Sequence, residues 1–446
     1  MMNPDVINRH SGPVPRYTSY PTAVQFSQNF GRADYINWLE ELPDNASLSL
    51  YFHIPYCQAL CWYCACATKA VRRYEPVSGY LVALQREVTN VAALLPKNHR
   101  VRAIHWGGGT PTILLPIDIT RLIDLTRSAF RLDPTADFAI EIDPRFLDAG
   151  QVSALQRGGI TRVSVGVQDF DERVQIAVNR QQSFEMTQRA VELFRDIGIA
   201  SINIDLIYGL PHQTLSSVEK TIGQVLTLKP ARIAVFGYAH VPHRAKHQTL
   251  IDAEALPGVL ARYNQRNRLA ELLVTAGYQS VGIDHFALPA DSLASKSISR
   301  NFQGYTTDDC DATIGLGATA IGQLPGGYVQ NAPSVPDYIR RIEHNGLATA
   351  RGLALGAEDR MRAFVIERLM CDFSVSAEAL ERKFGIAARH LEREAREIIE
   401  NDRDSLVEAT SDGFRCTELG RIFVRAICAR FDEYWTPGTD RHALAV

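Results

Sequence analysis

The 446-residue sequence has no long apolar run and almost no net charge, and these absences exclude several classes of protein. The longest uncharged stretch, residues 103–117, contains three glycines, two prolines and a histidine, which a membrane-spanning helix would not have. The N-terminus shows no apolar core after a basic start, so no signal peptide is predicted. A net charge of −3 gives no general attraction to nucleic acid or anionic membranes. We therefore expect a cytoplasmic protein with no nucleic-acid partner and no membrane span.

Cysteine is also scarce, but its distribution is uneven. Of the eight cysteines, four lie within ten residues, at Cys57, Cys61, Cys64 and Cys66. In a reducing compartment, clustered thiols are more often metal ligands or catalytic groups than disulfide partners. The other four are scattered, and Cys428, in an apolar segment, is interpreted as a small buried hydrophobic residue.

The first three clustered cysteines have the spacing C-x3-C-x2-C, which allows three interpretations. A structural zinc site normally uses two separate C-x2-C pairs, and a second pair is missing here. A redox dithiol formed by Cys61 and Cys64 would leave Cys57 and Cys66 unexplained. An iron–sulfur cluster uses all three thiolates and leaves one iron open for a small ligand, and it is the favoured interpretation.

A glycine-rich segment, Trp106-Gly-Gly-Gly-Thr-Pro-Thr112, follows a predicted strand. Glycines allow a backbone to approach a ligand closely. The segment lacks the Gly-Lys-Ser/Thr of a phosphate-binding loop and does not match G-x-G-x-x-G, so a nucleotide-phosphate site is excluded. If the cysteine segment follows the first strand and the glycines follow the second, the two are adjacent in a parallel sheet.

Six short β-rich runs alternate with segments of helical periodicity, which predicts an α/β fold with a parallel sheet. The expected strands are Leu48–His53, Val101–Trp106, Phe138–Ile142, Arg162–Val167, Ile202–Ile207 and Ile233–Tyr238, and the expected helices are Tyr80–Leu95, Asp118–Phe130, Ser183–Ile197, Ser216–Leu228 and Val259–Ala276. The alternation alone does not separate a doubly wound sheet from a partial barrel. Polar or glycine residues follow the carboxyl ends of five strands (Gly107–Thr110, Asp143–Arg145, Gln168–Asp169, Gly209 and His240), which favours a curved sheet around one site.

The pattern changes near residue 350, which predicts three parts. These are an N-terminal arm (1–46), a barrel with its extension (47–345) and a mostly helical C-terminal domain (350–446). In the last part we expect helices at Ala357–Met370, Ala377–Phe384 and Ala387–Glu400, a hairpin around Ser411–Gly413 and a final helix from Leu419 to about Trp435. This arrangement has a winged-helix character but no concentrated basic face, so packing against the barrel or covering a substrate is favoured over DNA binding.

The chain resembles the radical S-adenosylmethionine superfamily, and most closely the oxygen-independent coproporphyrinogen III oxidases, also called coproporphyrinogen dehydrogenases. The matching segments are Arg16-Tyr-Thr-Ser-Tyr-Pro-Thr22, His53-Ile-Pro-Tyr-Cys57, His105–Pro111, Gly166–Phe170, Val178–Arg180, Asn203–Pro211, Tyr238–His240, Asp284–Ala287 and Arg300–Thr307. The resemblance covers almost the whole chain. It implies a partial (β/α)6 TIM-like barrel.

The resemblance also implies roles for individual residues. Cys57, Cys61 and Cys64 would bind a [4Fe–4S] cluster, and Cys66 would not be a ligand. The cluster-bound S-adenosyl-L-methionine would contact Tyr51, Gly108, Glu141, Ala239 and Ile321, and a second S-adenosyl-L-methionine would contact Tyr63, Gly109, Thr110, Gln168, Arg180 and Asp205. Taken without the family, Asp205 could equally be a satisfied core acid and Arg180 a surface ion-pair partner.

The implied activity is that of an oxidoreductase in anaerobic haem biosynthesis. It removes two propionate carboxylates of coproporphyrinogen III oxidatively, leaving vinyl groups and giving protoporphyrinogen IX. No catalytic residue is expected beyond the cofactors. Arg16, Tyr17, Tyr20, His285 and Tyr305 are candidates for substrate binding. A monomer is expected, served by a low-potential electron donor and an electron acceptor that the sequence does not name.

Three other functions compete with this prediction. A haem chaperone of the same family typically lacks the long arm and the cysteine two places after the third ligand, whereas this chain has both, in Arg16–Thr22 and Cys66. A radical methyltransferase that processes haem uses the same scaffold. A non-catalytic iron–sulfur protein is the third alternative.

Overall fold

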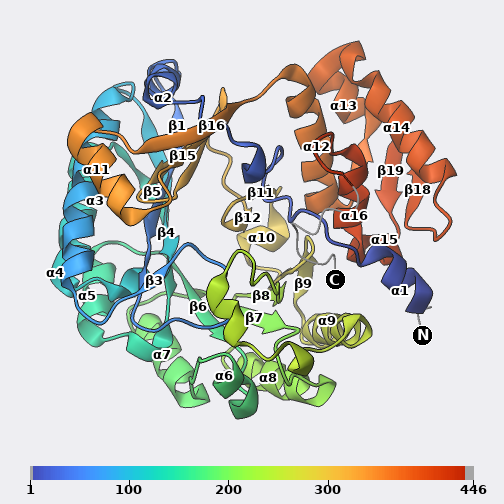
Figure 1. The fold of residues 1–446 in the computed structure, drawn as a ribbon, viewed down its shortest axis with the longest axis horizontal. Helices are drawn as coiled ribbons and strands as arrows, with labels where there is room; N and C mark the ends of the chain where they lie inside the picture. The colour runs from blue at the N-terminus through green and yellow to red at the C-terminus, as the bar shows by residue number, and fades with distance from the viewer. Residues whose placement is uncertain (1–3, 437–446) are drawn as a thin grey trace.

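The centre of the molecule is a curved sheet of twelve strands, of which seven run parallel side by side (Figure 1). The structure, a computed structural model, describes residues 4–436. The parallel strands, in spatial order, are β13 (Ala312–Leu316), β1 (Ser47–Ile54), β4 (Arg100–Gly108), β5 (Leu132–Ile142), β6 (Arg162–Gln168), β7 (Ser201–Tyr208) and β8 (Arg232–Gly237). All six predicted strands are confirmed. The seventh, β13, was not predicted as a strand, and it adds to the barrel on the free side of β1.

Helices cover the outside of this sheet in an arc (Figure 1). They are α3 (Glu75–Leu94), α4 (Pro116–Ala129), α5 (Ala149–Arg157), α6 (Glu172–Ala177), α7 (Phe184–Asp196), α8 (Leu215–Thr227) and α9 (Val259–Thr275). The five predicted helices correspond to α3, α4, α7, α8 and α9 within a few residues. Among the described residues, no helix has the length and apolarity needed to cross a membrane.

Alternation along the strands sends apolar side chains to the helices and polar ones to the barrel lumen. In β7, Ile202, Ile204 and Leu206 are buried, whereas Asn203 and Asp205 between them line a cavity in the lumen. Successive side chains of a strand point to opposite faces of its sheet, so this register fixes which residues can reach a ligand. The strands therefore have one apolar face and one polar face, and are not the continuous apolar runs expected for a sheet covered on both sides.

Antiparallel strands extend the sheet at both edges. Next to β13 lie β14 (Ile321–Leu324), β15 (Gly327–Asn331) and β16 (Thr349–Ala354), and next to β8 lie β10 (His285–Ala287) and β9 (Gln279–Val281). The hairpin of β11 (Ser299–Asn301) and β12 (Gly304–Thr306), the short helix α10 (Ser292–Ser295) and the helix α11 (Val335–Asn345) complete this region.

The C-terminal part combines helices with a three-stranded sheet. Its elements are α12 (Ala357–Asp372), β17 (Ser374–Ser376), α13 (Ala377–Phe384), α14 (Arg389–Glu400), β18 (Val407–Thr410), β19 (Gly413–Cys416), α15 (Glu418–Ile422) and α16 (Val424–Cys428). The predicted helices and hairpin are present. The prediction of a single helix from Leu419 to about Trp435 was wrong, because the segment breaks at Phe423 (φ −104°, ψ 17°) into two short helices and a 3₁₀ turn.

The N-terminal arm packs against this C-terminal part. Its helix α1 (Pro4–His10) and the following chain place Ile7, Val14, Tyr17 and Tyr20 in the C-terminal hydrophobic core. The second helix, α2 (Arg32–Glu40), instead contributes Leu39 to the core of the barrel. The division of the chain at residues 46 and 350 stays a prediction.

Candidate active site

The four clustered cysteines lie in a loop, the cysteine loop (residues 55–70), that begins directly after β1. Its ends form the short parallel strands β2 (Tyr56–Cys57) and β3 (Lys69–Ala70). On β4, Gly108 lies opposite Ile54, the last residue of β1, and the amide of Gly109 donates to the Ile54 carbonyl at 2.8 Å. The glycine segment and the cysteine loop are therefore neighbours at the carboxyl edge of the sheet, as the sequence predicts.

Each of the three predicted ligand sulfurs has a polar hydrogen-bonding partner. The Cys57 Sγ lies 3.3 Å from the Thr68 hydroxyl, and the Cys66 amide lies 3.4 Å from the Cys64 Sγ. The Cys61 Sγ accepts from two guanidinium groups at 3.4 Å each, those of Arg145 and Arg180. Hydrogen bonds to the cysteine sulfurs are typical of protein iron–sulfur sites, in which they help to set the reduction potential.

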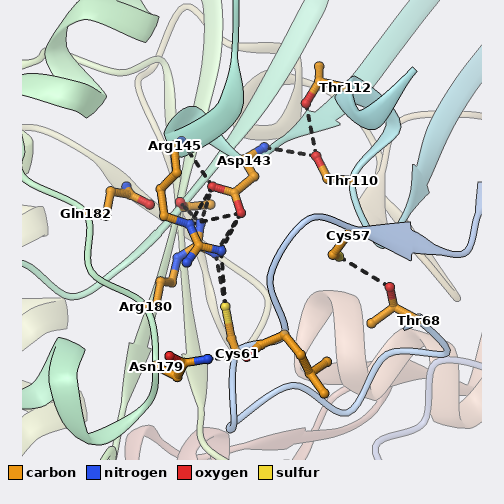
Figure 2. A network of polar contacts seen from close by, with 12 residues as sticks. Cys57, Cys61, Thr68, Thr110, Thr112, Asp143, Arg145, Asn179, Arg180 and Gln182 are labelled. Carbon is orange, nitrogen blue, oxygen red and sulfur yellow. Dashed lines mark hydrogen bonds and ion pairs between the residues drawn. The ribbon is translucent and has the colours of Figure 1, made fainter. Parts of the chain in front are cut away.

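The two arginines at Cys61 are held by a shared carboxylate, Asp143 (Figure 2). The Arg145 Nη2 donates to the Asp143 Oδ2 at 2.6 Å, and the Arg180 Nη1 donates to the same oxygen at 3.3 Å. All three side chains are more than nine-tenths buried. Burial opposes ionisation of Asp143, but the charges of Arg180 and Arg145 outweigh it and lower the pKa of this carboxyl. The network therefore places net positive charge beside one ligand sulfur.

The cysteine loop suits a cluster that spreads its ligands over several metals. Across residues 4–436, no three His, Cys, Asp or Glu side chains converge on a point where one ion could bind. In a [4Fe–4S] cluster each thiolate binds a different iron, so the sulfurs need not converge. Burial raises the pKa of the Cys57 thiol to about 12, and a bound metal would reverse this by stabilising the thiolate. Cys66, the fourth cysteine, is exposed.

The triple glycine has a local packing reason in addition to any role toward a ligand. A Cβ on Gly107 would lie 2.9 Å from the carboxylate of Glu141, and one on Gly109 would lie 2.4 Å from the Tyr56 carbonyl oxygen. Gly108 has φ +114°, a conformation that other residues rarely adopt. The glycines therefore let the end of β4 fit between the cysteine loop and β5.

Below the cysteine loop, a cavity of about 510 Å³ occupies the barrel lumen. Its polar lining includes Tyr51, His105, Glu141, Ser164, Asp205 and His285. The two carboxylates are held in different ways. His105 Nε2 lies 3.0 Å from a Glu141 oxygen, and the Gly108 amide donates to the other. Asp205 accepts from Ser164 and Asn203 at 2.8 Å each.

These contacts move the pKa values of the two carboxyls in opposite directions. Burial opposes ionisation of Glu141, but the hydrogen bond and charge of His105 outweigh it, so the pKa of Glu141 is lowered. Burial raises the pKa of Asp205, because the hydrogen bonds from Ser164 and Asn203 offset it only in part. Glu141 is therefore the more persistent negative charge in the lumen, suited to a cationic ammonium or to hydroxyl donors.

A second charged group lies where the arm and the C-terminal part meet the barrel. Asp284 accepts from His285 at 2.6 Å and lies 3.7 Å from Arg300, whose guanidinium stacks 4.5 Å above the Tyr305 ring. Burial opposes ionisation of Asp284, but the charge of Arg300 and the hydrogen bond of His285 lower its pKa to about 2. The Arg300 side chain is 7% exposed, and two of its nitrogens have no hydrogen-bond partner within the described residues.

Two more arginines approach this group, from opposite ends of the chain. Arg16 on the arm donates to the Gly237 carbonyl at 3.1 Å, and it is exposed. Arg425 on α16 is half-buried. Its pKa is lowered to about 10 by burial and by the neighbouring charges of Arg16 and Arg300. Three cations close enough to oppose each other's charge form a region that an anionic ligand would stabilise.

Other predicted site residues lie near the carboxyl edge of the parallel sheet, which forms the rim of the lumen. Gln168, with φ +73°, ends β6, and its amide and the Arg180 guanidinium both lie beside Gly166. The Ala239 carbonyl accepts from Gln248, which also donates to the Tyr63 carbonyl. Further residues have partners of their own: Thr110 accepts from the Asp143 amide, and Ile321 begins β14 beside Gly315, which pairs with Tyr51.

Three of the candidates for substrate binding use their hydroxyls within the protein. Tyr17 donates to Asp432 at 3.0 Å, and Tyr20 accepts from the Glu433 amide at 3.2 Å. Tyr305 donates to the Met370 carbonyl and accepts from the Ile283 amide. The structure thus places His285 and Tyr305 in the wall of the cavity and Arg16 near the adjacent Asp284, whereas Tyr17 and Tyr20 join the arm to the C-terminal segment.

Two family profiles and several curated proteins match this chain. The profile of the Radical SAM superfamily matches residues 51–225, and that of the HemN C-terminal domain matches residues 355–423. A protein from Bradyrhizobium diazoefficiens, named oxygen-independent coproporphyrinogen III oxidase, is 45% identical over 97% of each chain. A protein of the same name from Paracoccus denitrificans is 44% identical over 94% of each chain. The chain belongs to the family of oxygen-independent coproporphyrinogen III oxidases.

The fold agrees with this family along nearly its full length. The solved structure of coproporphyrinogen III oxidase from Escherichia coli, described as a radical SAM enzyme, has a TM-score of 0.90 and 37% sequence identity. The match covers 94% of this chain and 98% of that one. Membership of the radical SAM family implies a [4Fe–4S] cluster and S-adenosylmethionine, which the donor set at Cys57, Cys61 and Cys64 fits.

The sequence does not identify several residues that the structure places in the candidate active site. The sequence indicates Asp143 and Arg145 only as polar residues after a strand, although polar residues in that position can themselves predict a functional site. His105 and Arg300 lie within matching motifs and could have been named from them. Arg425 lies in an apolar C-terminal segment, where no sequence pattern indicates it.

Proposed function

We propose that this chain is an oxygen-independent coproporphyrinogen III oxidase, an oxidoreductase that converts two propionates of coproporphyrinogen III to vinyl groups and gives protoporphyrinogen IX. The main support is one spatial relation. The cysteine loop begins at the end of β1, whose Tyr51 lines the polar lumen, and Arg16, Arg300 and Arg425 gather around Asp284, whose neighbour His285 lines the same lumen. Relatives that are 45% and 44% identical have this name. Predicted to be cytoplasmic and monomeric, the enzyme would act in anaerobic haem biosynthesis.

The residues of the chain bind, orient and enclose the reactants. When bound, the cluster and S-adenosyl-L-methionine would supply the one-electron reduction and hydrogen-atom abstraction that begin each decarboxylation. Glu141, kept ionised by His105, would bind the ammonium or hydroxyls of the cofactor. Each propionate loses a hydrogen atom, carbon dioxide and one electron in becoming a vinyl group, so an electron acceptor is also required.

The substrate has four propionates, and the structure offers cations for them. Arg300 has two buried guanidinium nitrogens without hydrogen-bond partners in the described part of the chain, and Arg16 and Arg425 lie near enough for mutual repulsion. Carboxylates would satisfy these donors and relieve that repulsion. We assign to this group the propionates that are not reacting, which would orient the reacting one toward the cysteine loop.

We further propose two S-adenosyl-L-methionine molecules. Glu141 with Tyr51 and Gly108 would contact the one bound to the cluster. The rim around Arg180, Gln168 and Thr110 would contact the second, with Asp205 beside it in the lumen. Equilibrium dialysis of the reconstituted enzyme should give two bound molecules per chain. For Arg180→Ala we expect one of the two to be lost while the cluster absorbance is unchanged; two sites of unaltered affinity would contradict this assignment.

The decisive experiment is one anaerobic turnover. Reconstituted protein with dithionite and S-adenosyl-L-methionine should convert coproporphyrinogen III to protoporphyrinogen IX and release 5′-deoxyadenosine. Cys61→Ala should lose both the cluster absorbance and turnover, whereas Cys416→Ala, which changes a buried thiol on β19, should keep both. Stable haem binding with no decarboxylation would support the haem chaperone, and a Cys61→Ala protein with four irons would refute the ligand assignment.

A further inference from the structure

Three exposed cations, Lys69, Arg72 and Arg73, lie in five residues at the end of the cysteine loop, and we call them the basic patch. None of the three makes an ion pair or hydrogen bond through its side chain within residues 4–436. Several exposed arginines of the C-terminal part, by contrast, pair with neighbouring carboxylates, as Arg382 does with Glu378. In a chain with a net charge of −3, the patch is a local concentration of uncompensated positive charge.

The patch is connected to a cluster ligand by direct backbone contacts. β3, which contains Lys69, pairs with β2, which contains Cys57, and the Val71 amide donates to the Cys57 carbonyl at 2.9 Å. Thr68, next to Lys69, contacts the Cys57 sulfur (Figure 2). Neighbouring strands lie about 4.8 Å apart. The surface that presents the patch is therefore only one strand away from the place where the cluster would be bound.

Beside the patch, the surface is hollowed between the cysteine loop and α11. This hollow is lined by Pro55, Lys69, Arg72, Pro336, Ile339 and Arg340 among others. Arg340 pairs with Asp337, and among the described residues Glu343 is the one acidic residue in the lining, so the net positive charge of the hollow comes from the three cations of the basic patch. An apolar floor with a charged rim is the usual composition of a protein–protein interface, and it differs from a site for a small anion.

Protein side chains occupy two other sides of the cluster position. Arg145 and Arg180 occupy the side of Cys61, and His247 contacts the Cys64 carbonyl. The lumen below is needed for substrate and cofactor, and its lining residues do not include any residue of the hollow. A protein bound at the hollow would therefore leave the lumen accessible.

We propose that the basic patch and its hollow bind a small acidic one-electron carrier protein, which reduces the cluster held by Cys57, Cys61 and Cys64. The proposal rests on the proposed function, which requires a reductant. In the transfer the carrier loses one electron and the cluster gains one; no proton is transferred, and no covalent bond forms or breaks. Opposite charge steers a carrier of this kind to the patch and accelerates its association at low salt.

A charge-reversed variant tests this proposal. Lys69→Glu, Arg72→Glu and Arg73→Glu are combined, and the matched control combines Lys97→Glu, Arg189→Glu and Lys220→Glu, three exposed cations elsewhere on the barrel. The probe is a reduced, acidic plant-type [2Fe–2S] ferredoxin, with binding measured by titration and cluster reduction by anaerobic stopped-flow absorbance. We expect the patch variant to bind and be reduced at least about tenfold less well at low salt, with the difference shrinking at high salt.

Two further measurements keep the proposal separate from the proposed function. With photoreduced 5-deazariboflavin, an uncharged donor, the patch variant should be reduced at the wild-type rate and keep its cluster content and melting temperature. Failure of wild-type turnover with that donor would count against the proposed function alone. The docking proposal would be overturned if the patch variant bound ferredoxin as well as wild type does, or if the control variant lost as much binding. It would also be overturned if the patch variant lost binding only to RNA or anionic vesicles.

Discussion

Arg145 and Arg180 both donate to the Cys61 sulfur, and they are themselves fixed by Asp143. Positive charge and N–H donors at a cluster sulfur stabilise the reduced, more negative form of the cluster. The two arginines differ in their other contacts, since Arg180 also donates to the Gly166 carbonyl. Arg145 is therefore the better position at which to change the cluster environment alone.

For Arg145→Met we expect a cluster that still assembles but has a more negative midpoint potential, because one N–H···S contact and one charge are removed. Anaerobic potentiometry followed by electron paramagnetic resonance measures this directly. Arg145→Lys retains the charge and should recover part of the shift. An unchanged potential in Arg145→Met, with four irons bound, would show that the contact does not affect the cluster.

Glu141→Gln should weaken S-adenosyl-L-methionine binding by about tenfold to a hundredfold, as expected for loss of a charge-assisted hydrogen bond. Because His105 lowers the pKa of Glu141, the carboxylate is ionised throughout pH 6–8, and wild-type affinity should not change through it in this range. Equilibrium dialysis checks both points. Glu192→Gln, on the exposed face of α7, is the control. An affinity equal to wild type in Glu141→Gln would remove this residue from the binding site.

Helices and strands whose apolar residues recur with a clear helical or strand period could be predicted from the sequence, and short ones could not. The alternation in Ser201–Tyr208 identifies β7 and also places Asp205 on its polar face. β13 was missed because Ala312–Leu316 is short, contains a glycine and has no period of its own; its position depends on pairing with β1. The break at Phe423 also depends on tertiary packing, since a Cβ on nearby Gly420 would lie 1.8 Å from the Leu406 carbonyl oxygen.

The same limit applies to the site. Motifs located Glu141 and the cysteine ligands in the chain, but they did not show that Asp143 would join Arg145 to Arg180. That contact combines the end of β5 with a loop beyond α6. Arg425 was the hardest to predict, because only the docking of the C-terminal part brings it close to Arg16 and Arg300.

Glu87 on α3 joins the helix to the residue after β13, to β15 and to α11 through a buried carboxylate. It accepts from the Gly317 amide, the Asn331 side chain and the Tyr338 hydroxyl at 2.6–2.7 Å. Even so, burial outweighs these hydrogen bonds and raises its pKa to about 7. Between about pH 4.5 and 7, therefore, Glu87 is protonated in the folded state, whereas in the unfolded state it has already released its proton.

We accordingly expect this group to destabilise the fold as pH rises through that window, by up to about 3 kcal/mol. Melting temperatures of wild type and Glu87→Gln, measured from pH 5 to 8, should show the difference: relative to the variant, wild type loses stability with increasing pH. Glu343→Gln, an exposed change on α11, is the control. Parallel pH profiles for wild type and Glu87→Gln would refute a raised pKa.

At the scale of the whole molecule, the arm connects the two ends of the chain. Tyr17 donates to Asp432, 415 residues away, and Ile7 and Val14 lie in the same core as Phe431. Arg16, next to Tyr17, reaches the Gly237 carbonyl at the barrel. The arm therefore links the C-terminal core to the rim of the lumen.

Tyr17→Phe removes the buried hydrogen bond and should weaken docking of the arm by about 1–2 kcal/mol. Hydrogen exchange should then show faster exchange in residues 4–21 and in the C-terminal core, with the amides of β4–β7 unchanged. Tyr434→Phe, which removes an exposed hydroxyl from Asp359, should leave both regions as in wild type. Unaltered exchange of the arm in Tyr17→Phe would show that the hydroxyl does not hold it in place.

The distance in sequence between Tyr17 and Asp432 also sets an order of events during synthesis. The arm leaves the ribosome before the barrel strands, whereas its partners on the C-terminal segment are made after them. The barrel strands between them can pair while translation continues. The arm that carries Arg16 can therefore dock only after the C-terminal segment has followed the barrel out of the ribosome, so a chain terminated before that segment would form a barrel whose substrate region is still open.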